Sequence, residues 1–283
     1  MSKISFLNGD FLPHEKCVVG IEDRGFQFAD GAYEVTLFEN NKLIDGDNHL
    51  IRMMRSLKEL NIVHDFTINY LKEVQIELFK KNNITSNYTI YLQITRGNHT
   101  RIPSCPKNLK PTICATIAPR KIFSDLEFFS GIKAMTHDDI RWQRCDIKTV
   151  NLLASTLINQ TAKDNGFDDA IYVRNNFITE ATYANIFIVD SKNNLITPPA
   201  DNHILCGITR NRLIEIAKRI NLNVIEKKFT IDELLLSQEA FLTSSSLIIR
   251  PINQIDSKII KNKYDESSIA FKLKTEYLKF ISQ

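Results

Sequence analysis

Short turns that join one strand candidate directly to the next constrain the fold of this chain more than any other feature. Asn-Gly or Asn-Asn pairs at positions 8–9, 40–41 and 175–176 each separate two strand candidates, and such pairs are typical of hairpin turns. Helix candidates also occur, for example over residues 67–81 and, with one apolar face, over residues 152–164. Because strands and helices do not alternate regularly, the pattern argues against a TIM barrel or a doubly wound sheet and predicts an α+β fold.

The length of the chain suggests two domains, because its 283 residues exceed the roughly 100–200 residues of a typical domain. A polar, proline-led stretch, PRKIFSDLEF from Pro119, follows the strand candidate at residues 112–118 and is the expected interdomain link. We therefore predict an N-terminal α/β domain over residues 1–120. A C-terminal α+β domain is predicted over residues 121–283, and it contains Lys148.

Local signals indicate where two of the helices begin or end. Asp47 is expected to cap a helix that carries Leu50, Met53, Leu57 and Leu60 on one face. Residues 165–166, Asn-Gly, are expected to end the helix over 152–164. A closing helix is expected over residues 271–281.

Composition and charge exclude several classes of protein. The 43% of hydrophobic and 24% of charged residues are ordinary for a globular protein. No apolar run approaches the ~20 residues that a membrane-spanning helix needs, and the first residues lack the apolar core of a signal peptide. The 36 basic and 33 acidic residues are evenly spread, so neither a nucleic acid nor a membrane is an expected partner. The five scattered cysteines form no CxxC pair, which argues against a metal site and favours a cytoplasmic protein.

Two charged residues lie beside apolar segments and allow two interpretations each. Lys148, in DDIRWQRCDIKTVNLL, either extends along apolar surface to solvent or supplies the neutral amine that Schiff-base chemistry needs. Apolar surroundings and neighbouring cations make a lysine lose its proton more easily. Glu180, in FITEATYANIF, is either a solvated turn carboxylate or a group that keeps a cofactor's ring nitrogen protonated.

Three further segments are candidates for binding a phosphate. In ILCGITRNRL, Gly207 or Thr209 either simply caps a helix or forms part of an anion seat at the helix N-terminus. The run TSSS, residues 243–246, is either an ordinary turn or a set of hydroxyl donors. Arg52, on a helix candidate, is either solvated or a charged clamp on phosphate.

Tyr33, in EDRGFQFADGAYEV, is on local grounds a half-buried aromatic residue that begins a strand.

In their order along the chain, EDRGFQFADGAYEV, DIRWQRCDIKTVNLL, TEATYAN and ILCGITR resemble the class IV (fold type IV) pyridoxal-phosphate aminotransferases. The resemblance is greatest to the D-amino-acid (D-alanine) aminotransferase branch and runs from about Leu7 to the region of Pro251. It implies the two-domain fold of that family, pyridoxal 5'-phosphate as cofactor, and transamination between D-amino acids and 2-oxo acids of the D-alanine and D-glutamate type. It also implies a homodimer with shared active sites, each in the cleft between domains near the subunit interface.

The resemblance implies a role for each matching residue around the cofactor. Lys148 matches the lysine that forms the Schiff base and then moves the α-proton, and Glu180 matches the carboxylate paired with the ring nitrogen. Leu205 matches the apolar side chain packed behind the ring. The residues that match the family's phosphate contacts are Arg52, Ile208, Thr209, Ser244 and Ser245.

On the substrate side, Tyr33 matches a tyrosine near the α-carboxylate, and Arg101 matches an arginine that reaches this carboxylate from the neighbouring subunit. The chain departs from the family pattern at two places that bear on the substrate. The D-alanine branch has a histidine two positions after the arginine, where this chain has Pro103, although His99 lies two positions before it. Tyr183 stands in the family's serine-rich run after the glutamate, so a much larger side chain lies near the cofactor or substrate edge.

Other functions on the same fold stay open at this point. Branched-chain L-amino-acid aminotransferases and aminodeoxychorismate lyases share it, and Tyr33 with Arg101 favours the D-specific branch over both. A non-catalytic protein that binds a phosphate-containing ligand is a different class. The presence of both Lys148 and Glu180 argues against it, because phosphate binding alone needs neither residue.

Overall fold

The computed structural model describes residues 3–282 and divides the chain into two compact units. Unit 1 runs to Lys121 and also includes Ile147–Asn151, whereas unit 2 takes Ile122–Asp146 and continues from Leu152. The sequence prediction assigned Lys148 to the second domain, but its segment belongs to unit 1. The reason is local: the segment forms backbone hydrogen bonds with the strand that follows Asp30, including one from the amide of Val150 to the carbonyl of Gly31 at 3.1 Å.

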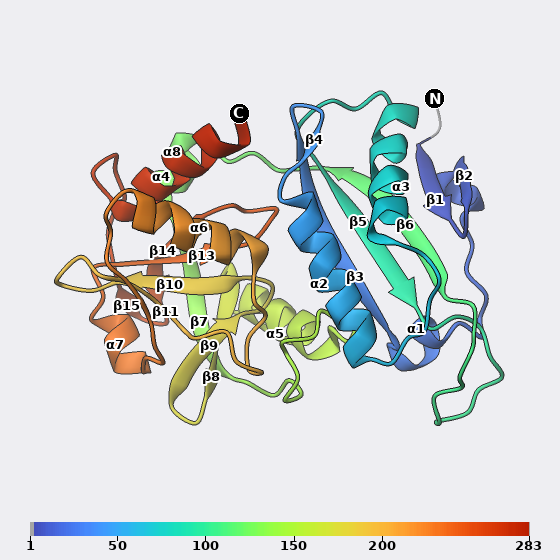
Figure 1. Cartoon of the computed structure of the whole chain (residues 1–283). Helices are drawn as coiled ribbons and strands as arrows, with labels where there is room; N and C mark the ends of the chain where they lie inside the picture. The colour runs from blue at the N-terminus through green and yellow to red at the C-terminus, as the bar shows by residue number, and fades with distance from the viewer. Residues whose placement is uncertain (1–2, 283) are drawn as a thin grey trace. The chain divides into compact units, whose positions relative to one another are not determined.

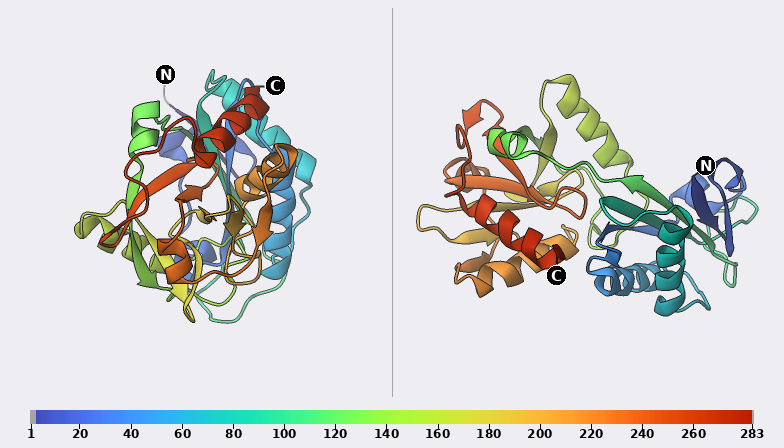
Figure 2. Two further views of the ribbon diagram at one scale, coloured as in Figure 1. Left: turned by 90° about the vertical axis from the view of Figure 1, so that its left-hand side faces the viewer. Right: turned by 90° about the horizontal axis from the view of Figure 1, so that it is seen from above.

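Unit 1 is built on a six-stranded antiparallel sheet in the order β2-β1-β6-β5-β3-β4. The strands are β1 (Ile4–Leu7), β2 (Asp10–Pro13), β3 (Gly31–Glu39), β4 (Lys42–Leu43), β5 (Tyr88–Thr95) and β6 (Thr112–Pro119). The helical segments are η1 (His14–Lys16), α1 (Arg24–Phe28), α2 (Gly46–Glu59) and α3 (Ile68–Lys81). Helices α2 and α3 lie on the same face of the sheet (Figures 1 and 2).

The apolar face of α2 forms much of the core of unit 1. Leu50, Met53 and Leu57 are fully buried and pack with side chains of α3, β5 and β6, as their spacing predicted. The predicted cap is wrong. The N-cap is Asp45, whose φ of 52° is left-handed and whose side chain makes no capping bond. Asp47 instead lies in the first turn and pairs with Lys72 at 2.7 Å.

Unit 2 contains a nine-stranded mixed sheet in which β12-β11-β10-β13-β14-β7-β8-β9 form the main order and β15 pairs with β14. The strands are β7 (Ile132–Asp138), β8 (Asp169–Arg174), β9 (Phe177–Ala181), β10 (Asn185–Val189), β11 (Leu195–Thr197), β12 (Val224–Glu226), β13 (Glu239–Thr243), β14 (Arg250–Ile255) and β15 (Lys258–Ile259). The helices are α4 (Asp125–Ser130), α5 (Leu153–Asp164), α6 (Ile208–Arg219), α7 (Ile231–Leu235) and α8 (Ile269–Ser282). Helices α6 and α8 pack against each other on one face, and α5 covers β7 and β8 on the other (Figures 1 and 2).

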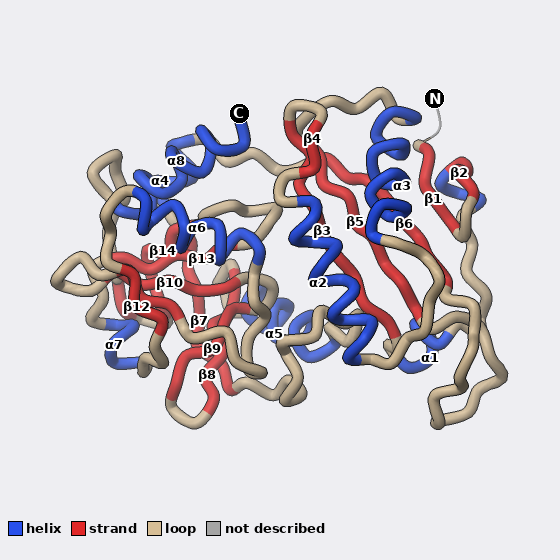
Figure 3. The backbone as a smooth tube through the Cα atoms, viewed as in Figure 1, coloured by secondary structure: helices blue, strands red, loops and turns tan. Residues whose placement is uncertain are grey.

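The predicted hairpins and the α+β class are confirmed. The pairs at positions 8–9, 40–41 and 175–176 all have positive φ angles, which asparagine and glycine tolerate best, and each pair joins two antiparallel strands (Figure 3). The expected link from Pro119 is partly helical, because Ser124 and Glu127 form a reciprocal capping box that starts α4.

Two further findings hold for residues 3–282. Their helices are too short or too polar to span a lipid bilayer. In the same residues, no three His, Cys, Asp or Glu side chains are grouped as metal ligands would be.

Candidate functional site

A buried ionic cluster joins β3 to α2 in unit 1. Glu34 points from β3 toward α2, where His49 and Arg52 are one turn apart on the buried face. Arg52 donates from Nε to Glu34 Oε1 and from Nη2 to Oε2, both at 2.8 Å, and His49 Nδ1 lies 2.7 Å from Oε2. Arg52 is therefore neither solvated nor loosely placed, since a two-point ion pair fixes the plane of its guanidinium.

Burial and ion pairing have opposite effects on the acid groups of this cluster. Burial alone would raise the pKa of the Glu34 carboxyl, but the Arg52 charge and hydrogen bonds from Arg52 and His49 outweigh it and lower that pKa to about 2. Burial also lowers the pKa of His49, helped by the charges of Arg52 and Lys148 and opposed by Glu34. The imidazole is therefore neutral at pH 7, and we assign its Nδ1 hydrogen to the bond with Glu34.

The lowered pKa of Glu34 predicts a loss of stability in acid. A carboxyl whose pKa falls from 4.5 in the unfolded chain to about 2 in the fold stabilises the fold fully above pH 4.5. This contribution, on the order of a few kcal/mol, is lost as the pH falls from 4.5 toward 2. Urea unfolding at a series of pH values checks it.

Two variants separate this effect from the general acid response of the chain. Glu34→Gln should flatten the pH dependence in that window, whereas Glu39→Gln on the same strand should keep it. An unchanged slope in Glu34→Gln would contradict the ionised state assigned to Glu34.

Lys148 is held against β3 and α2 through its backbone. Its carbonyl accepts from the amide of Tyr33 at 3.0 Å, and its own amide donates to Ser56 Oγ at 3.3 Å. The side chain is half-buried, and Nζ lies 4.2 Å from the centre of the Tyr33 ring. The structure thus brings together two predicted site residues, Lys148 and Tyr33, beside the Glu34 cluster of unit 1.

The remaining substrate-side residues of unit 1 have different environments. Tyr33 is buried and its ring stacks on Tyr91, with centres 5.3 Å apart. Arg101 is exposed in the loop between β5 and β6, where its guanidinium lies 4.9 Å from the centre of the Phe28 ring. His99, the alternative to the missing histidine, has its Nδ1 2.7 Å from the carbonyl oxygen of Thr100.

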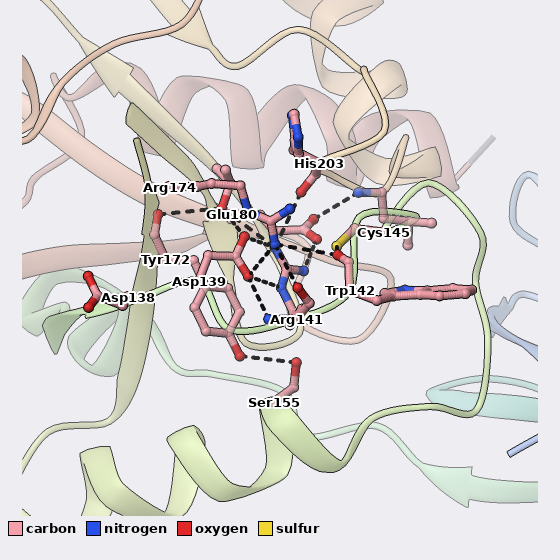
Figure 4. A network of polar contacts seen from close by, with 12 residues as sticks. Asp138, Asp139, Arg141, Trp142, Cys145, Ser155, Tyr172, Arg174, Glu180 and His203 are labelled. Carbon is pink, nitrogen blue, oxygen red and sulfur yellow. Dashed lines mark hydrogen bonds and ion pairs between the residues drawn. The ribbon is translucent and has the colours of Figure 1, made fainter. Parts of the chain in front are cut away.

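Glu180 is the centre of a second cluster, which lies entirely in unit 2 (Figure 4). It is buried on β9, so the interpretation as a solvated turn residue is wrong. Oε1 pairs with Arg141 Nη1. Oε2 accepts from Asn185 Nδ2 at 3.2 Å and from the amide of Leu205 at 3.1 Å. Asn185 Nδ2 also donates to the Leu205 carbonyl at 2.8 Å, so Glu180, Asn185 and Leu205 form one network.

Arg141 was not assigned a role from the sequence, yet it organises this cluster. Its Nε and Nη2 donate to the two oxygens of Asp139, each at 2.9 Å, and its guanidinium stacks 4.3 Å from the centre of the Tyr172 ring. Figure 4 shows Arg141 between Asp139 and Glu180. The residue lies in the segment DIRWQRCDIK, but Arg144 is there too. Without the fold, nothing separates Arg141 from Arg144, whose partner is Asp146 at 3.0 Å.

Burial and ion pairing act against each other in this second cluster. It raises the pKa of Glu180, although the Arg141 charge and hydrogen bond and the Leu205 amide act against it. For Arg141, burial would lower the pKa, but hydrogen bonding to Asp139 and the charges of Glu180 and Asp139 outweigh burial and raise that pKa. Glu180 is thus a carboxylate of increased basicity beside a permanent cation, which suits it to share a proton with a ring nitrogen.

The predicted phosphate contacts of unit 2 come from two backbone turns. Gly207 is the N-cap of α6 and has no side chain to cap it, so the amides of Ile208 and Thr209 begin the helix without a side-chain cap. A Cβ at Gly207 would lie 2.0 Å from Asn185 Oδ1, so a larger residue there would displace the Asn185 side chain. Ser244 and Ser245 follow β13, and Ser244 Oγ accepts from the amide of Leu247 at 3.3 Å.

These residues fit a phosphorylated pyridine. Immediately before the serine run, the buried hydroxyl of Thr243 has no hydrogen-bond partner within the described part of the chain, and an additional polar ligand would satisfy it. A helix N-terminus and hydroxyl groups suit a phosphate, and a buried basic carboxylate suits a pyridine nitrogen. Tyr183 projects from the turn after β9, is 47% exposed, and has its hydroxyl 3.0 Å from Thr156 Oγ1 on α5.

Comparisons with known proteins agree on one family. The sequence model of the class IV aminotransferases matches residues 31–255. The D-alanine aminotransferase of Bacillus licheniformis is 37% identical over 253 residues, which are 89% of this chain and 88% of that protein. The D-alanine aminotransferase of Staphylococcus epidermidis is 37% identical over 265 residues, 93% and 92% of the two chains.

Solved structures agree with this fold. The branched-chain amino acid aminotransferase of Escherichia coli superposes with a TM-score of 0.91 at 21% identity, covering 99% of this chain and 95% of that one. A hypothetical aminotransferase from Mycobacterium tuberculosis in a PLP-bound form gives a TM-score of 0.85 at 18% identity, covering 98% and 99%. At these identities the likeness establishes the fold and carries no information about substrate.

Proposed function

The chain belongs to the class IV aminotransferases, and we propose that it catalyses transamination between D-amino acids and 2-oxo acids with pyridoxal 5'-phosphate as its cofactor. The observation that carries the D-specificity is the 37% identity, over about nine-tenths of the chain, to proteins named D-alanine aminotransferase. The sequence identity to the branched-chain aminotransferase is only 21%, so this similarity does not indicate whether the substrate is a D- or an L-amino acid.

We assign Lys148 and Glu180 to the reaction itself. When bound, the cofactor supplies an electron sink for the pair left on the α-carbon. Lys148 Nζ would take the α-proton and return it to the cofactor carbon on the far side of the amino nitrogen, so one amine would serve as base and then as acid. Glu180 would hold a proton on the ring nitrogen. Arg141, bonded to Oε1, keeps the carboxyl oriented while Asn185 and Leu205 bond Oε2.

We assign the phosphate to Arg52, the amides of Ile208 and Thr209, and the hydroxyls of Ser244 and Ser245. The pair with Glu34 supports the role of Arg52, because it fixes the guanidinium before any ligand arrives and so reduces the entropy lost on binding. The neutral state of His49 also supports this role of Arg52, because an uncharged imidazole leaves Arg52 as the main ionic partner of Glu34. Leu205 is assigned to pack against the cofactor ring.

We also propose a homodimer in which Arg101 binds the substrate carboxylate of the partner's site, together with Tyr33 of that site. Large apolar side chains are exposed in the N-terminal part of unit 1, where Val18, Ile21 and Phe26 are 75%, 80% and 77% accessible. Arg101 lies over Phe28, which is two positions after Phe26 in the sequence. Exposed apolar surface of this kind is typical of a protein interface.

Arg101→Ala should raise the Michaelis constant for D-amino acids, because this chain lacks the second cationic partner. A charge-assisted bond to a carboxylate is worth about 1.5–3 kcal/mol, or roughly 10- to 150-fold in affinity. The rate at saturation should fall less. Steady-state kinetics check this, and unchanged substrate affinity would refute the carboxylate role.

A mixed dimer tests whether Arg101 acts across the interface. One subunit carries Lys148→Ala and the other Arg101→Ala. If Arg101 serves the partner, both lesions fall in one site and about half of the activity remains. If it acts within its own chain, each site has one lesion and activity at low substrate collapses, which would contradict the shared site.

An assay of amino donors and acceptors tests the function as a whole. We expect turnover with D-alanine or D-glutamate and a 2-oxo acid, with a D-amino acid as product by chiral chromatography. Turnover confined to branched-chain L-amino acids would replace the proposal with the L-specific alternative. Release of pyruvate from aminodeoxychorismate, with no transamination, would indicate the lyase. Cofactor binding without any turnover would indicate a non-catalytic binding protein.

A further inference from the structure

A separate cavity of about 150 Å³ lies within unit 2, between the β8–β9 hairpin and the loop that leads to α6. None of the residues assigned to the cofactor or substrate lines it. Its apolar lining residues are Phe177, Ile178, Pro198, Pro199 and Ile204. An apolar cavity of about this volume holds a single benzene ring, so the space suits one ring or a branched chain of similar size.

The rim of the cavity has one cation that is only loosely paired. Lys228 Nζ is 3.8 Å from Asp201 Oδ2 and 6.0 Å from the centre of the Phe177 ring. Asp201 is more firmly bonded elsewhere, since its Oδ1 accepts from the amide of His203 at 2.8 Å.

Arg174, a second cation that lines the cavity, already has protein partners. It pairs with Asp139 at 3.1 Å and donates to the carbonyl of Arg141 at 3.0 Å. One loosely paired cation beside an acid suits a ligand with a single negative charge and disfavours a phosphate dianion.

The walls of this cavity are bonded to the network that holds Glu180. Thr179 precedes Glu180 on β9, and its Oγ1 donates to Asp139 at 3.1 Å. The carbonyl of His203 accepts from Arg141 Nη2 at 3.3 Å. Ile204 precedes Leu205, whose amide donates to Glu180. A shift of the walls of the cavity therefore displaces direct partners of Arg141 and Glu180.

We propose that this cavity is an effector site for a small monocarboxylate with one ring or a branched apolar chain, and that its occupant changes the reaction rate through the Arg141–Glu180 pair. The site itself rests on the cavity alone, and the effect on rate rests on the proposed function. Lys228 binds the carboxylate, and the apolar lining residues receive the ring.

Benzoate is the probe, with acetate and benzamide as matched compounds that lack the ring and the charge. Binding is measured by calorimetry on the holoenzyme after aminooxyacetate has blocked the substrate site. Burial of the ring predicts that acetate binds at least about tenfold more weakly than benzoate. Lys228→Gln should weaken benzoate roughly threefold, as expected for a half-exposed ion pair. Lys227→Gln is the control, because Lys227 pairs with Glu233 and does not line the cavity.

The effect on the reaction is measured as the rate of the half-reaction at saturating D-alanine, without the blocking agent. Benzoate should change this rate in the wild type and in Lys227→Gln. In Lys228→Gln about three times the benzoate concentration should be needed for the same effect, as the roughly threefold weaker binding requires. No binding to the blocked enzyme, or equal binding by Lys228→Gln and wild type, would overturn the site. Binding without a change in rate would overturn the effector role. Calorimetry detects benzoate binding whether or not the enzyme turns over. An absence of transamination would therefore contradict the proposed function without contradicting the binding site.

Discussion

Replacing Lys148 with alanine is expected to abolish transamination while leaving unit 1 folded. The backbone bonds of residue 148 to Tyr33 and Ser56 do not involve the side chain and persist in the variant. The substitution removes the interaction of Nζ with the Tyr33 ring, which is worth about 0.5–1 kcal/mol. The rate should fall by 10²–10⁴-fold or more, since proton transfer by a positioned group contributes about that factor.

Reduction of the holoenzyme with borohydride, followed by peptide mapping, identifies the lysine that carries the cofactor. The adduct is expected on the peptide that contains Lys148. Lys163→Ala, which removes a lysine from the last turn of α5, is the control and should keep full activity. An adduct on another lysine, or substantial activity in Lys148→Ala, would contradict the assignment.

Glu180→Gln is expected to reduce the rate of the chemical step by about 10²–10³-fold, the usual cost of losing one charge-stabilising group in an active site. The amide cannot hold a ring nitrogen protonated, and its NH₂ group faces either Arg141 or the donors of Asn185 and Leu205. Cofactor affinity should change much less, because the phosphate contacts are untouched. Stopped-flow absorbance and cofactor titration measure the two quantities.

Glu239→Gln is a matched control for this variant. Glu239 is another buried carboxylate of unit 2, and it accepts from the amides of Ile269 and Ala270 and pairs with Lys261 at 3.0 Å. Its loss should lower the stability of unit 2 and leave the rate per folded enzyme unchanged. If Glu180→Gln only lowers stability in the same way, the role assigned to Glu180 is wrong.

Local sequence rules predicted the elements that local forces determine. The hairpin turns followed from asparagine and glycine pairs because positive φ angles are an intrinsic preference of these residues. The apolar face of α2 followed from the spacing of its leucine and methionine residues. The position of its cap did not follow. Gly46 is compatible with the first helical turn, so the helix begins one residue before the expected Asp47 cap.

Contacts distant in sequence could not be predicted in the same way. Arg141 meets Glu180 across 39 positions, and Glu34 meets Arg52 across 18, and no local pattern indicates which acid each arginine will meet. The segment of Lys148 joins unit 1 because it pairs with β3, a preference that its composition does not reveal. The resemblance to a family indicated the residue types of the site, whereas the supporting partners became visible only in the structure.

Single half-reactions test most directly whether this chain moves the amino groups of D-amino acids. The purified holoenzyme is mixed with matched D- and L-amino acids, without any acceptor, and the visible absorbance of the cofactor is followed. We expect rapid conversion of the cofactor with D-alanine and D-glutamate and little or none with their L-enantiomers, and no conversion with either in Lys148→Ala. Conversion by L-amino acids alone would contradict the proposed D-specificity.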